Sequence, residues 1–441
     1  MSKDSSSPSR RQFLRGAGAV AVAAPFVTTG LQAASPNGKL QHASFGCSGM
    51  AGSDINSLTK HDNLQLVAAA DVSKRSRELL KAKFPDIRLY EDWRELLEKE
   101  GDQIDSVNVS TPDHMHGPIG LASLAKGKHV YCQKPLTQNL WECRQMMLRA
   151  REAGVMTQMG IQVSSGFEER FAVRLVQDGV IGKVKEVHSF SNKKWGDPSP
   201  RPSSGETPPD DLNWDLWLGV AEDRPYISGH YHPGNWRKRR DFGTGTLGDM
   251  GCHIFSSWFR GLALSSPLAV KSTGPEPNEH NWAINGKVEY TFPGTFYTEG
   301  QTVKVTWYDG DARPPQEIQE LVKNIPGQGN VVVGTEGVML HPHGGNPRLF
   351  PADKYTGFRY PKLQPRNHYL EYVDCCLERK GKPSANFEYA SPMSEAVLLG
   401  CLASMFPNET LLWDSDNLKV RNSEAATSYV KRKYRKGWEV S

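Results

Sequence analysis

The sequence predicts an α/β protein with two domains, and two observations indicate this class. Residues 40–160 alternate short apolar runs with amphipathic stretches, which is typical of a parallel sheet with helices on both faces. After residue 160 the strands become alternating and rich in Val, Tyr, Thr and Trp, which favours a large, mostly antiparallel sheet with one open face. We therefore expect a doubly wound first domain over 40–160 and an α/β second domain over 161–441.

The first domain is expected to contain repeated strand–helix–strand units. Its strands are short apolar runs, and its helices carry apolar residues at helical spacing, as Leu79, Leu80 and Ala82 do. We predict strands at 43–47, 64–71, 106–110, 129–132 and 156–159, and helices at 73–84, 93–98, 118–126 and 140–153.

The second domain begins with a helix and a strand, and a loop rich in Pro, Ser and Asp follows over 197–211. A glycine-rich stretch from residue 243 leads into another helix. We predict further helices at 168–178, 368–380 and 392–406, strands at 185–190, 287–292 and 303–308, and a hairpin of 330–334 with 337–341.

The N-terminus resembles a twin-arginine secretion signal over residues 1–34. Ser9-Arg-Arg-Gln-Phe-Leu-Arg15 precedes a weak apolar run of 12 residues, which is too short to span a bilayer. Leu31-Gln-Ala33 offers a small-residue cleavage site. We expect the twin-arginine export machinery to carry the folded protein to the periplasm or beyond, without stable membrane insertion.

Charge and cysteines exclude some partners. The net charge of +4 belongs partly to the signal, and no basic cluster with interleaved aromatic residues is present, so we expect no nucleic-acid partner. The seven cysteines show no metal-ligand spacing. We expect buried free thiols and no metal site.

A glycine-rich turn directly follows the first strand and fits a phosphate-binding turn. Such a turn needs glycines where the backbone meets a pyrophosphate, and the next helix offers its amides. An acidic residue ending the second strand would bind ribose hydroxyls and favour NAD, although a nearby Arg could accept the extra phosphate of NADP. The residues concerned are Gly46, Ser48, Gly49, Met50, Ala51, Asp71 and Arg75. Alternatively the turn is an ordinary strand–helix connection and the acid is a helix cap.

Polar residues follow two later strands, at the sheet edge where such folds bind ligands. We expect Ser110, Thr111, Pro112, His116 and Gln133 to contact the cofactor. Lys134 would stand at the same crevice and exchange protons during catalysis, unless it is a surface residue in a loop.

Asp249 and His253 are four residues apart and share one helical face. His suits the role of base for a hydroxyl proton, and the acid could orient the imidazole or hold a substrate hydroxyl. Alternatively, they are a capping Asp and a structural His. Aromatic and hydrogen-bonding residues that suit a sugar precede them, among them Trp195, Trp236, Arg237 and Arg240.

These motifs together resemble the glucose–fructose oxidoreductase and inositol dehydrogenase family (Gfo/Idh/MocA), in particular its secreted members. The resemblance implies a Rossmann domain, a second domain that often carries the oligomer interface, and roles at the nicotinamide for Lys134, Asp249 and His253; Gln162 would contact substrate. Gln133, Ser48 and the pair Ser256 and Ser257 depart from the family pattern. The motifs are Thr111-Pro-Asp-His-Met-His116, Cys132-Gln-Lys-Pro135, Met159-Gly-Ile-Gln162, Trp214-Asp-Leu-Trp-Leu-Gly219, Asn235-Trp-Arg237 and Leu247-Gly-Asp-Met-Gly-Cys-His253.

Export and cofactor together favour an NAD(P)-dependent enzyme that holds its cofactor tightly and acts on a sugar or glycoside. Little free NAD is present outside the cytoplasm, so a resident cofactor would be recycled on the enzyme. Three readings stay open: an oxidoreductase that exchanges hydride between sugars, a glycosidase or lyase working through transient oxidation, and an inactive sugar-binding member of the fold.

Overall fold

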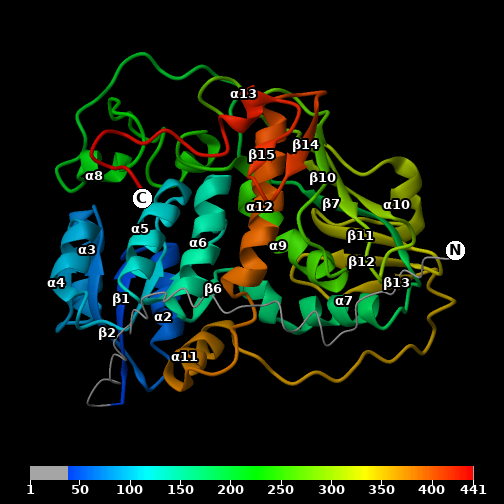
Figure 1. Cartoon of the computed structure of the whole chain (residues 1–441), viewed down its shortest axis with the longest axis horizontal. Coiled ribbons are helices and arrows are strands. Elements are labelled where there is room, and N and C mark those ends of the chain that lie inside the picture. Colours follow the sequence, from blue (N-terminus) through cyan, green and yellow to red (C-terminus); the bar gives the residue numbers. More distant parts are fainter. Residues whose placement is uncertain (1–37, 441) are drawn as a thin grey trace, which may run out of the picture. The chain divides into compact units, whose positions relative to one another are not determined.

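Six parallel strands form the first sheet, in the order β3-β2-β1-β4-β5-β6 (Figure 1). The structure is a computed structural model that describes residues 38–440. The order reverses between β1 and β4, which confirms the doubly wound arrangement and marks where such sheets bind ligands. The strands are β1 (Leu40–Phe45), β2 (Leu64–Ala70), β3 (Arg88–Tyr90), β4 (Ser106–Val109), β5 (His129–Cys132) and β6 (Thr157–Met159).

Five helices accompany this sheet, and side chains cap several of their N-termini. Ser73 accepts a hydrogen bond from the amide of Ser76, and Asn139 accepts one from the amide of Glu142, so exposed N–H groups at each helix start are satisfied. The helices are α2 (Met50–Leu58), α3 (Lys74–Lys83), α4 (Trp93–Glu100), α5 (Asp113–Ala125) and α6 (Leu140–Ala153).

Nine strands form the second sheet, in the order β13-β12-β11-β7-β10-β9-β8-β14-β15. Neighbouring strands are antiparallel except β7 and β10, which are parallel, so the prediction of a mostly antiparallel sheet is confirmed. The strands are β7 (Val184–Ser191), β8 (Ala269–Ser272), β9 (Lys287–Pro293), β10 (Thr302–Asp309), β11 (Gln328–Gly334), β12 (Val338–Pro342), β13 (Arg348–Phe350), β14 (Thr410–Asp414) and β15 (Lys419–Val420).

Helix α9 lies on the second sheet and carries the core of that domain. Its Phe255 and Trp258 pack with Trp307 and Phe292 of the sheet. Helix α12 packs against both α6 and α9, which joins the two domains into one hydrophobic core. The remaining helices are η1 (Gln162–Ser165), α7 (Phe167–Gln177), α8 (Trp214–Leu218), η2 (Asn235–Lys238), α9 (Gly245–Gly261), α10 (Gln316–Val322), α11 (His368–Glu378), α12 (Phe387–Ser404) and α13 (Glu424–Thr427).

Two helices begin earlier than predicted. The sequence suggested starts near 118 and 392, but α5 begins at Asp113 and α12 at Phe387, which leaves Pro118 and Pro392 inside the helices. Proline is common in the first turn of a helix, so a sequence pattern favours helix starts at these two positions. The earlier start brings Asp113 and His116 into α5.

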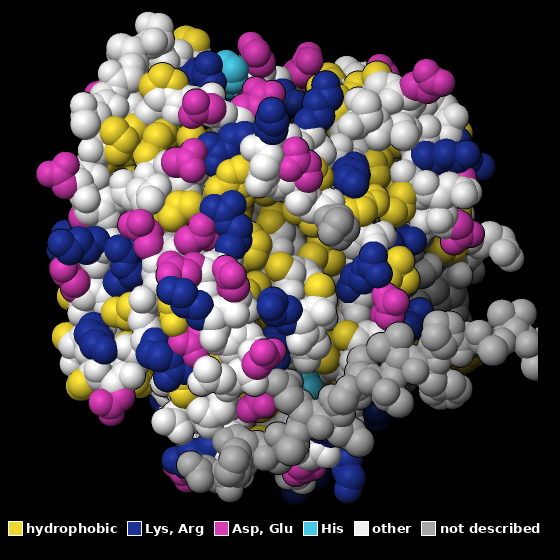
Figure 2. Space-filling model, turned by 60° about the vertical axis from the view of Figure 1, so that its left-hand side comes forward, with side chains coloured by type: hydrophobic (Ala, Val, Ile, Leu, Met, Phe, Trp, Pro, Cys, Tyr) yellow, Lys and Arg dark blue, Asp and Glu magenta, His cyan; other side chains and the backbone are white. Residues whose placement is uncertain are grey.

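The surface carries charges of both signs, and the cysteines are free thiols. On the face that Figure 2 shows, Lys and Arg side chains alternate with Asp and Glu side chains. All seven cysteines are free, and six of them are buried. Within residues 38–440, no helix has both the length and the apolar character that crossing a membrane requires. The predicted signal over 1–34 lies outside the described residues.

Candidate active site

The glycine-rich turn lies between β1 and α2 and is tightly packed. Gly46 has φ +106°, and a Cβ there would come within 2.8 Å of the Ala51 Cβ and 2.9 Å of the Ser110 carbonyl oxygen. Gly49 has φ +56° and precedes the first residue of α2. Only glycine fits at Gly46 without displacing the backbone, so the turn can approach a ligand as closely as a pyrophosphate requires.

Asp71 follows β2 and faces this turn. Its carboxylate accepts hydrogen bonds from the amides of Cys47 and Ser73, both at 2.8 Å. Burial raises the pKa of Asp71, and the two amides and Arg77 oppose that rise. The carboxylate therefore holds the turn and the start of α3 together, and it lines the cavity described next.

A cavity of about 320 Å³ runs along this edge of the sheet. It extends from the turn to residues of η2 in the second domain. Arg75 does not line it and is exposed, and Ala51, His116 and Gln133 are buried beside it without lining it. Predicted residues that line it are Gly46, Ser48, Gly49, Met50, Asp71, Ser110, Thr111, Pro112, Trp236 and Arg237.

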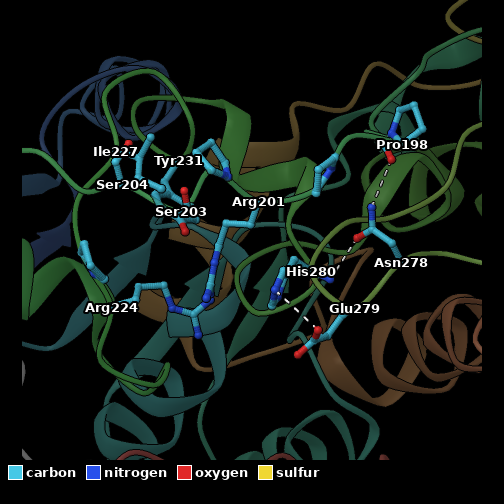
Figure 3. Close-up of a pocket in the computed structure, with 13 residues that line it drawn as sticks. Pro198, Arg201, Ser203, Ser204, Arg224, Ile227, Tyr231, Asn278, Glu279 and His280 are labelled. Carbon is cyan, nitrogen blue, oxygen red and sulfur yellow. Dashed lines mark hydrogen bonds and ion pairs between the residues drawn. The ribbon is translucent and has the colours of Figure 1, made fainter.

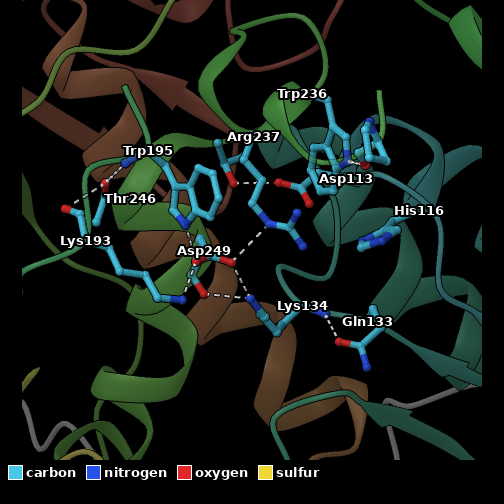
Figure 4. A network of polar contacts seen from close by, with 12 residues as sticks. Asp113, His116, Gln133, Lys134, Lys193, Trp195, Trp236, Arg237, Thr246 and Asp249 are labelled. Atoms are coloured by element: carbon cyan, nitrogen blue, oxygen red, sulfur yellow. Dashed lines mark hydrogen bonds and ion pairs between the residues drawn. The ribbon is translucent and has the colours of Figure 1, made fainter. Parts of the chain in front are cut away.

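Lys134 follows β5 and meets Asp249 of α9 (Figure 4). Its Nζ donates to Asp249 Oδ1 at 2.7 Å and to the Asp249 carbonyl oxygen at 2.8 Å. Three more groups surround this carboxylate: Lys193 Nζ at 3.1 Å and Trp195 Nε1 at 2.9 Å from Oδ2, and Arg237 Nε at 3.4 Å from Oδ1. Residues from both domains thus converge on one carboxylate.

The charges of this cluster fix the protonation state of Asp249. Burial alone would raise the pKa of Asp249, but Lys134, Lys193 and Arg237 outweigh burial and hold it well below its usual range. Asp249 is therefore ionised at neutral pH. It can orient the Lys134 ammonium, which is only 13 % exposed.

His253 lies one turn further along α9 and is neutral. Burial, then Lys134 and His343, hold the pKa of His253 well below its usual range. The ring centroids of His253 and His343 are 5.5 Å apart. His253 Nδ1 is buried and has no hydrogen-bond partner among the described residues. A neutral imidazole with a free nitrogen can accept a proton.

Gln133 points away from the cavity and into a buried polar network. Its Nε2 donates to both oxygens of Asp54, at 2.9 and 3.0 Å, and its Oε1 accepts from the Lys134 amide at 3.3 Å. Asp54 also accepts from Ser110 Oγ at 2.7 Å and from Tyr369 OH at 3.0 Å. This network holds the backbone amide of Lys134 on the side that faces away from the cavity.

His116 has a similar supporting position. Its Nδ1 lies 2.8 Å from the Pro135 carbonyl oxygen, and its Nε2 lies 2.8 Å from the Thr111 carbonyl oxygen. The buried ring thus ties the loop after β4 to the Lys134–Pro135 turn, whose peptide bond is cis. His116 therefore supports these two loops and does not itself line the cavity.

Only some of the residues predicted to bind substrate lie at the Asp249 cluster. Trp195 and Arg237 belong to the Asp249 cluster, and Arg237 also stacks on Trp236 with its guanidinium carbon 4.3 Å from the ring centre. Gln162 donates to Tyr369 OH at 3.0 Å and so lies in the network behind Lys134. Arg240 turns away from the cluster and donates to carbonyl oxygens of Asn278 and Glu279.

Sequence reasoning missed three residues of this region: Lys193, His343 and Asp54. Lys194 precedes Trp195 directly but pairs with Asp311, and its neighbour Lys193 reaches Asp249. Asp54 could have been noticed because it is an acid at the helical spacing of the apolar residues of α2, which are buried. His343 lies in the loop after β12 and gave none.

A second cavity of about 510 Å³ lies beneath the Pro- and Ser-rich loop (Figure 3). Arg201 and Arg224 project into it, and Arg224 pairs with Asp241 at 2.5 Å. It shares no lining residue with the first cavity. Of the residues around Asp249, Arg237 lines the 320 Å³ cavity, whereas Lys134, Asp249 and His253 are not part of its lining. No group of three metal-ligating side chains occurs among residues 38–440.

Several relatives of known name match part of the chain. The 2,7-anhydro-N-acetylneuraminate hydratase of Mediterraneibacter gnavus is 32% identical over 91 residues, 21% of this chain and 24% of that protein. The levoglucosan dehydrogenase of Pseudarthrobacter phenanthrenivorans is 24% identical over 163 residues, 37% of this chain and 34% of that protein. The matched segments therefore span only about a quarter to a third of these relatives.

Solved structures match over most of the chain. The aldose–aldose oxidoreductase of Caulobacter crescentus, complexed with glycerol, has a TM-score of 0.57 at 18% identity and covers 85% of this chain and 100% of that one. The WlbA dehydrogenase of Bordetella pertussis, in complex with NADH and UDP-GlcNAcA, has a TM-score of 0.59 at 15% identity, covering 85% and 99%. At these identities the likeness shows the fold.

Two family profiles match adjacent parts of the chain. An oxidoreductase family profile described as an NAD-binding Rossmann fold matches residues 41–161. The profile for the C-terminal alpha/beta domain of the same family matches residues 175–309. With the glycine turn, the doubly wound sheet and the Lys134–Asp249 cluster, these matches show that the chain belongs to the Gfo/Idh/MocA family of NAD-binding oxidoreductases.

Proposed function

We propose that this protein is an NAD(P)-dependent oxidoreductase that removes hydride from a carbinol carbon of a sugar or glycoside. The observation that carries the proposal is the meeting of Lys134 and Asp249 from two domains. Arg237 contacts this Asp249 and also lines the cavity that the glycine turn lines. The glycine turn fits the cofactor because it is too tightly packed for a side chain at Gly46, whose Cβ would clash with Ala51 and Ser110 and displace the turn. The nicotinamide group would accept the hydride when bound.

The chain's own residues supply the proton chemistry. Lys134 Nζ uses two of its three donors on Asp249, which leaves one for a substrate oxygen. Neutral His253 has a free buried nitrogen one helical turn away and can take the hydroxyl proton. Asp249 stays ionised and keeps the ammonium of Lys134 aligned. Trp195, whose Nε1 donates to Asp249, would place its ring against the apolar face of a sugar, while Arg237 covers the ring of the buried Trp236.

For the cofactor we propose NAD, held tightly. Asp71 lines the cavity, and a carboxylate there favours ribose hydroxyls over a 2′-phosphate. Arg75, the residue that could accept such a phosphate, is exposed outside the cavity lining. Mass spectrometry of the nucleotide released from natively purified protein tests this, and protein that releases no nucleotide would contradict tight binding.

Lys134→Met tests the reaction. General acid–base groups contribute about 10²- to 10⁴-fold in rate, so this variant should lose hydride transfer by that factor and retain cofactor. Lys194→Met is the matched control, since Lys194 pairs with Asp311 and lies outside the cluster. If the protein is an inactive sugar-binding protein, the wild type, Lys134→Met and Lys194→Met would bind the sugar equally well, and none of them would show turnover.

A second candidate is a glycosidase or lyase that oxidises, eliminates and reduces again. The observation that favours it is the pair of neutral histidines, His253 and His343, because elimination needs a second acid–base group besides the one that serves the hydroxyl. The hydratase among the relatives also supports non-dehydrogenase chemistry in such a scaffold. Release of an aglycone without net change in bound nicotinamide absorbance would distinguish it.

We also propose that the protein is exported by the twin-arginine route and acts in the periplasm as a homo-oligomer. The Arg10-Arg11 motif with its short apolar run supports the export route, and the family's second domain, which often carries the oligomer interface, supports the homo-oligomer. Arg10→Lys with Arg11→Lys should retain the protein in the cytoplasm, and light scattering on the exported form gives the number of subunits. Unchanged export of the double variant would contradict this route.

A further inference from the structure

Arg237 presents two amino groups without an acceptor. Its Nε faces Asp249 Oδ1 at 3.4 Å, and its guanidinium carbon lies 4.3 Å from the Trp236 ring centre and 5.6 Å from that of Trp195. In Figure 4 the two terminal nitrogens point away from Asp249. Among residues 38–440 neither has a hydrogen-bond acceptor. The indole rings thus hold a planar fork with its outer edge free.

Lys193 also has donors to spare. Its Nζ contacts Asp249 Oδ2 at 3.1 Å, which uses one of three N–H groups, and its side chain is 40 % exposed. Lys134, by contrast, is almost fully engaged with Asp249. Apart from the one N–H group left on Lys134, the free donors of the cluster therefore belong to Arg237 and Lys193.

The charges of the cluster do not balance. Three cations, Lys134, Lys193 and Arg237, surround one carboxylate, Asp249. A second acid, Asp113, interacts electrostatically with Arg237 and Lys134; it is buried and accepts a hydrogen bond from Thr244 Oγ1 at 2.7 Å. Even with Asp113 ionised, one positive charge is left over, and a partly buried excess charge is stabilised by an anion.

We propose that the sugar substrate carries a carboxylate, which Arg237 binds through its free edge and Lys193 through its free donors. The inference rests on the proposed function and names the substrate class of that site as sugar acids such as uronates. A carboxylate matches the guanidinium fork with two parallel hydrogen bonds, which a hydroxyl cannot do. The carboxylate takes no part in the redox step and fixes which carbinol faces Lys134.

The cofactor's own phosphates are the alternative partner for Arg237, because this residue also lines the 320 Å³ cavity. The glycine turn that suits a pyrophosphate lies at the end of that cavity formed by β1 and α2, whereas Arg237 comes from η2 and contacts Asp249. Lys193 does not line the cavity. Arg237 thus lies between the cavity of the glycine turn and the Asp249 cluster, and the affinity for NADH measured in the variants below distinguishes the two partners.

The test compares matched sugars on the full-length protein. Galactose with galacturonate and glucose with glucuronate are assayed for reduction of NAD, and their binding is measured by calorimetry in the presence of NADH. Hydrogen bonds between charged groups predict about a 10- to 100-fold preference in kcat/KM or Kd for the acid. Arg237→Gln and Lys193→Gln should remove most of this preference, Arg237→Lys should restore part of it, and Lys194→Gln should leave it intact.

The possible results separate the carboxylate assignment from the proposed function. Equal turnover or equal binding of acid and neutral sugar by the wild type overturns it and leaves the proposed function standing. Tighter binding of a sulfated sugar than of the uronate overturns the carboxylate assignment. A loss of NADH affinity in Arg237→Gln, with the acid preference unchanged, assigns this residue to the cofactor instead. Failure of the wild type to bind any nicotinamide cofactor contradicts the proposed function itself, and calorimetry without cofactor still decides whether the acid binds through Arg237.

Discussion

Replacing Asp54 by Asn should change how stability depends on pH. Asp54 is fully buried in α2 behind the Lys134 turn, where Gln133, Ser110 and Tyr369 donate hydrogen bonds to it. Burial raises the pKa of Asp54 from 3.8 to about 6, and the three hydrogen bonds limit the rise. The folded protein therefore holds a proton on this residue at pH values where the unfolded chain has lost it.

The sign and size follow from this difference in proton binding. A raised pKa adds stability that is fully present below the unfolded value of 3.8 and is lost as the pH rises through about 6. The gap corresponds to about 3 kcal/mol of unfolding free energy. Asn carries no charge at any pH, so the stability of the wild type relative to Asp54→Asn should fall by about this amount between pH ~4 and ~7.

Urea unfolding at several pH values measures this difference directly. Taking wild type minus variant cancels the titration of all other groups, and Asp62→Asn, at an exposed position after the same helix, is the control. Two parallel stability curves for wild type and Asp54→Asn would refute the reasoning, because they would mean that Asp54 titrates alike in the folded and unfolded protein.

Two substitutions and one pH profile test the cofactor cavity and the base. Gly46→Ala should abolish NAD binding by calorimetry, since its Cβ would lie 2.9 Å from the Ser110 carbonyl oxygen, while Gly52→Ala, with 3.8 Å to its nearest neighbour, should bind normally. Asp71→Ala should shift cofactor preference from NAD towards NADP by about tenfold or more, measured as the ratio of the two Kd values. Because the pKa of His253 is held below its usual range, the acid limb of kcat/KM should fall at a pH below 6.5, and an acid limb above that value would contradict a neutral His253.

The layers of the fold were predictable from local pattern. The strands of the first sheet are short and mostly buried, and β4 and β5 are buried at every residue, as both faces of that sheet are covered. Short elements were not predicted: β3 has three residues and β15 has two, which is too few for a period to show. These two strands form because they pair with β2 and β14, and a sequence pattern of two or three residues does not show such pairing.

The candidate site was predictable where residue type carries the chemistry. Lys134, Asp249 and His253 stand out because charged residues follow a buried strand or share one face of a glycine-rich helix. Arg75 and Arg240 carry the right charge, but sequence cannot show where a long side chain ends, and here both lie outside the cluster. Charge alone therefore names too many candidates, and tertiary contacts select among them.

The neighbouring lysines after β7 show how a further sequence signal could have narrowed that choice. In an extended segment, side chains two residues apart point to the same side and adjacent ones to opposite sides. Lys193 and Trp195 both reach Asp249, while Lys194 between them pairs with Asp311 on the other side. Once Trp195 is placed in the site, the period of two assigns Lys193 to it and excludes Lys194. This alternation, and not the identity of the residues, is what makes the two lysines a matched pair of active residue and control.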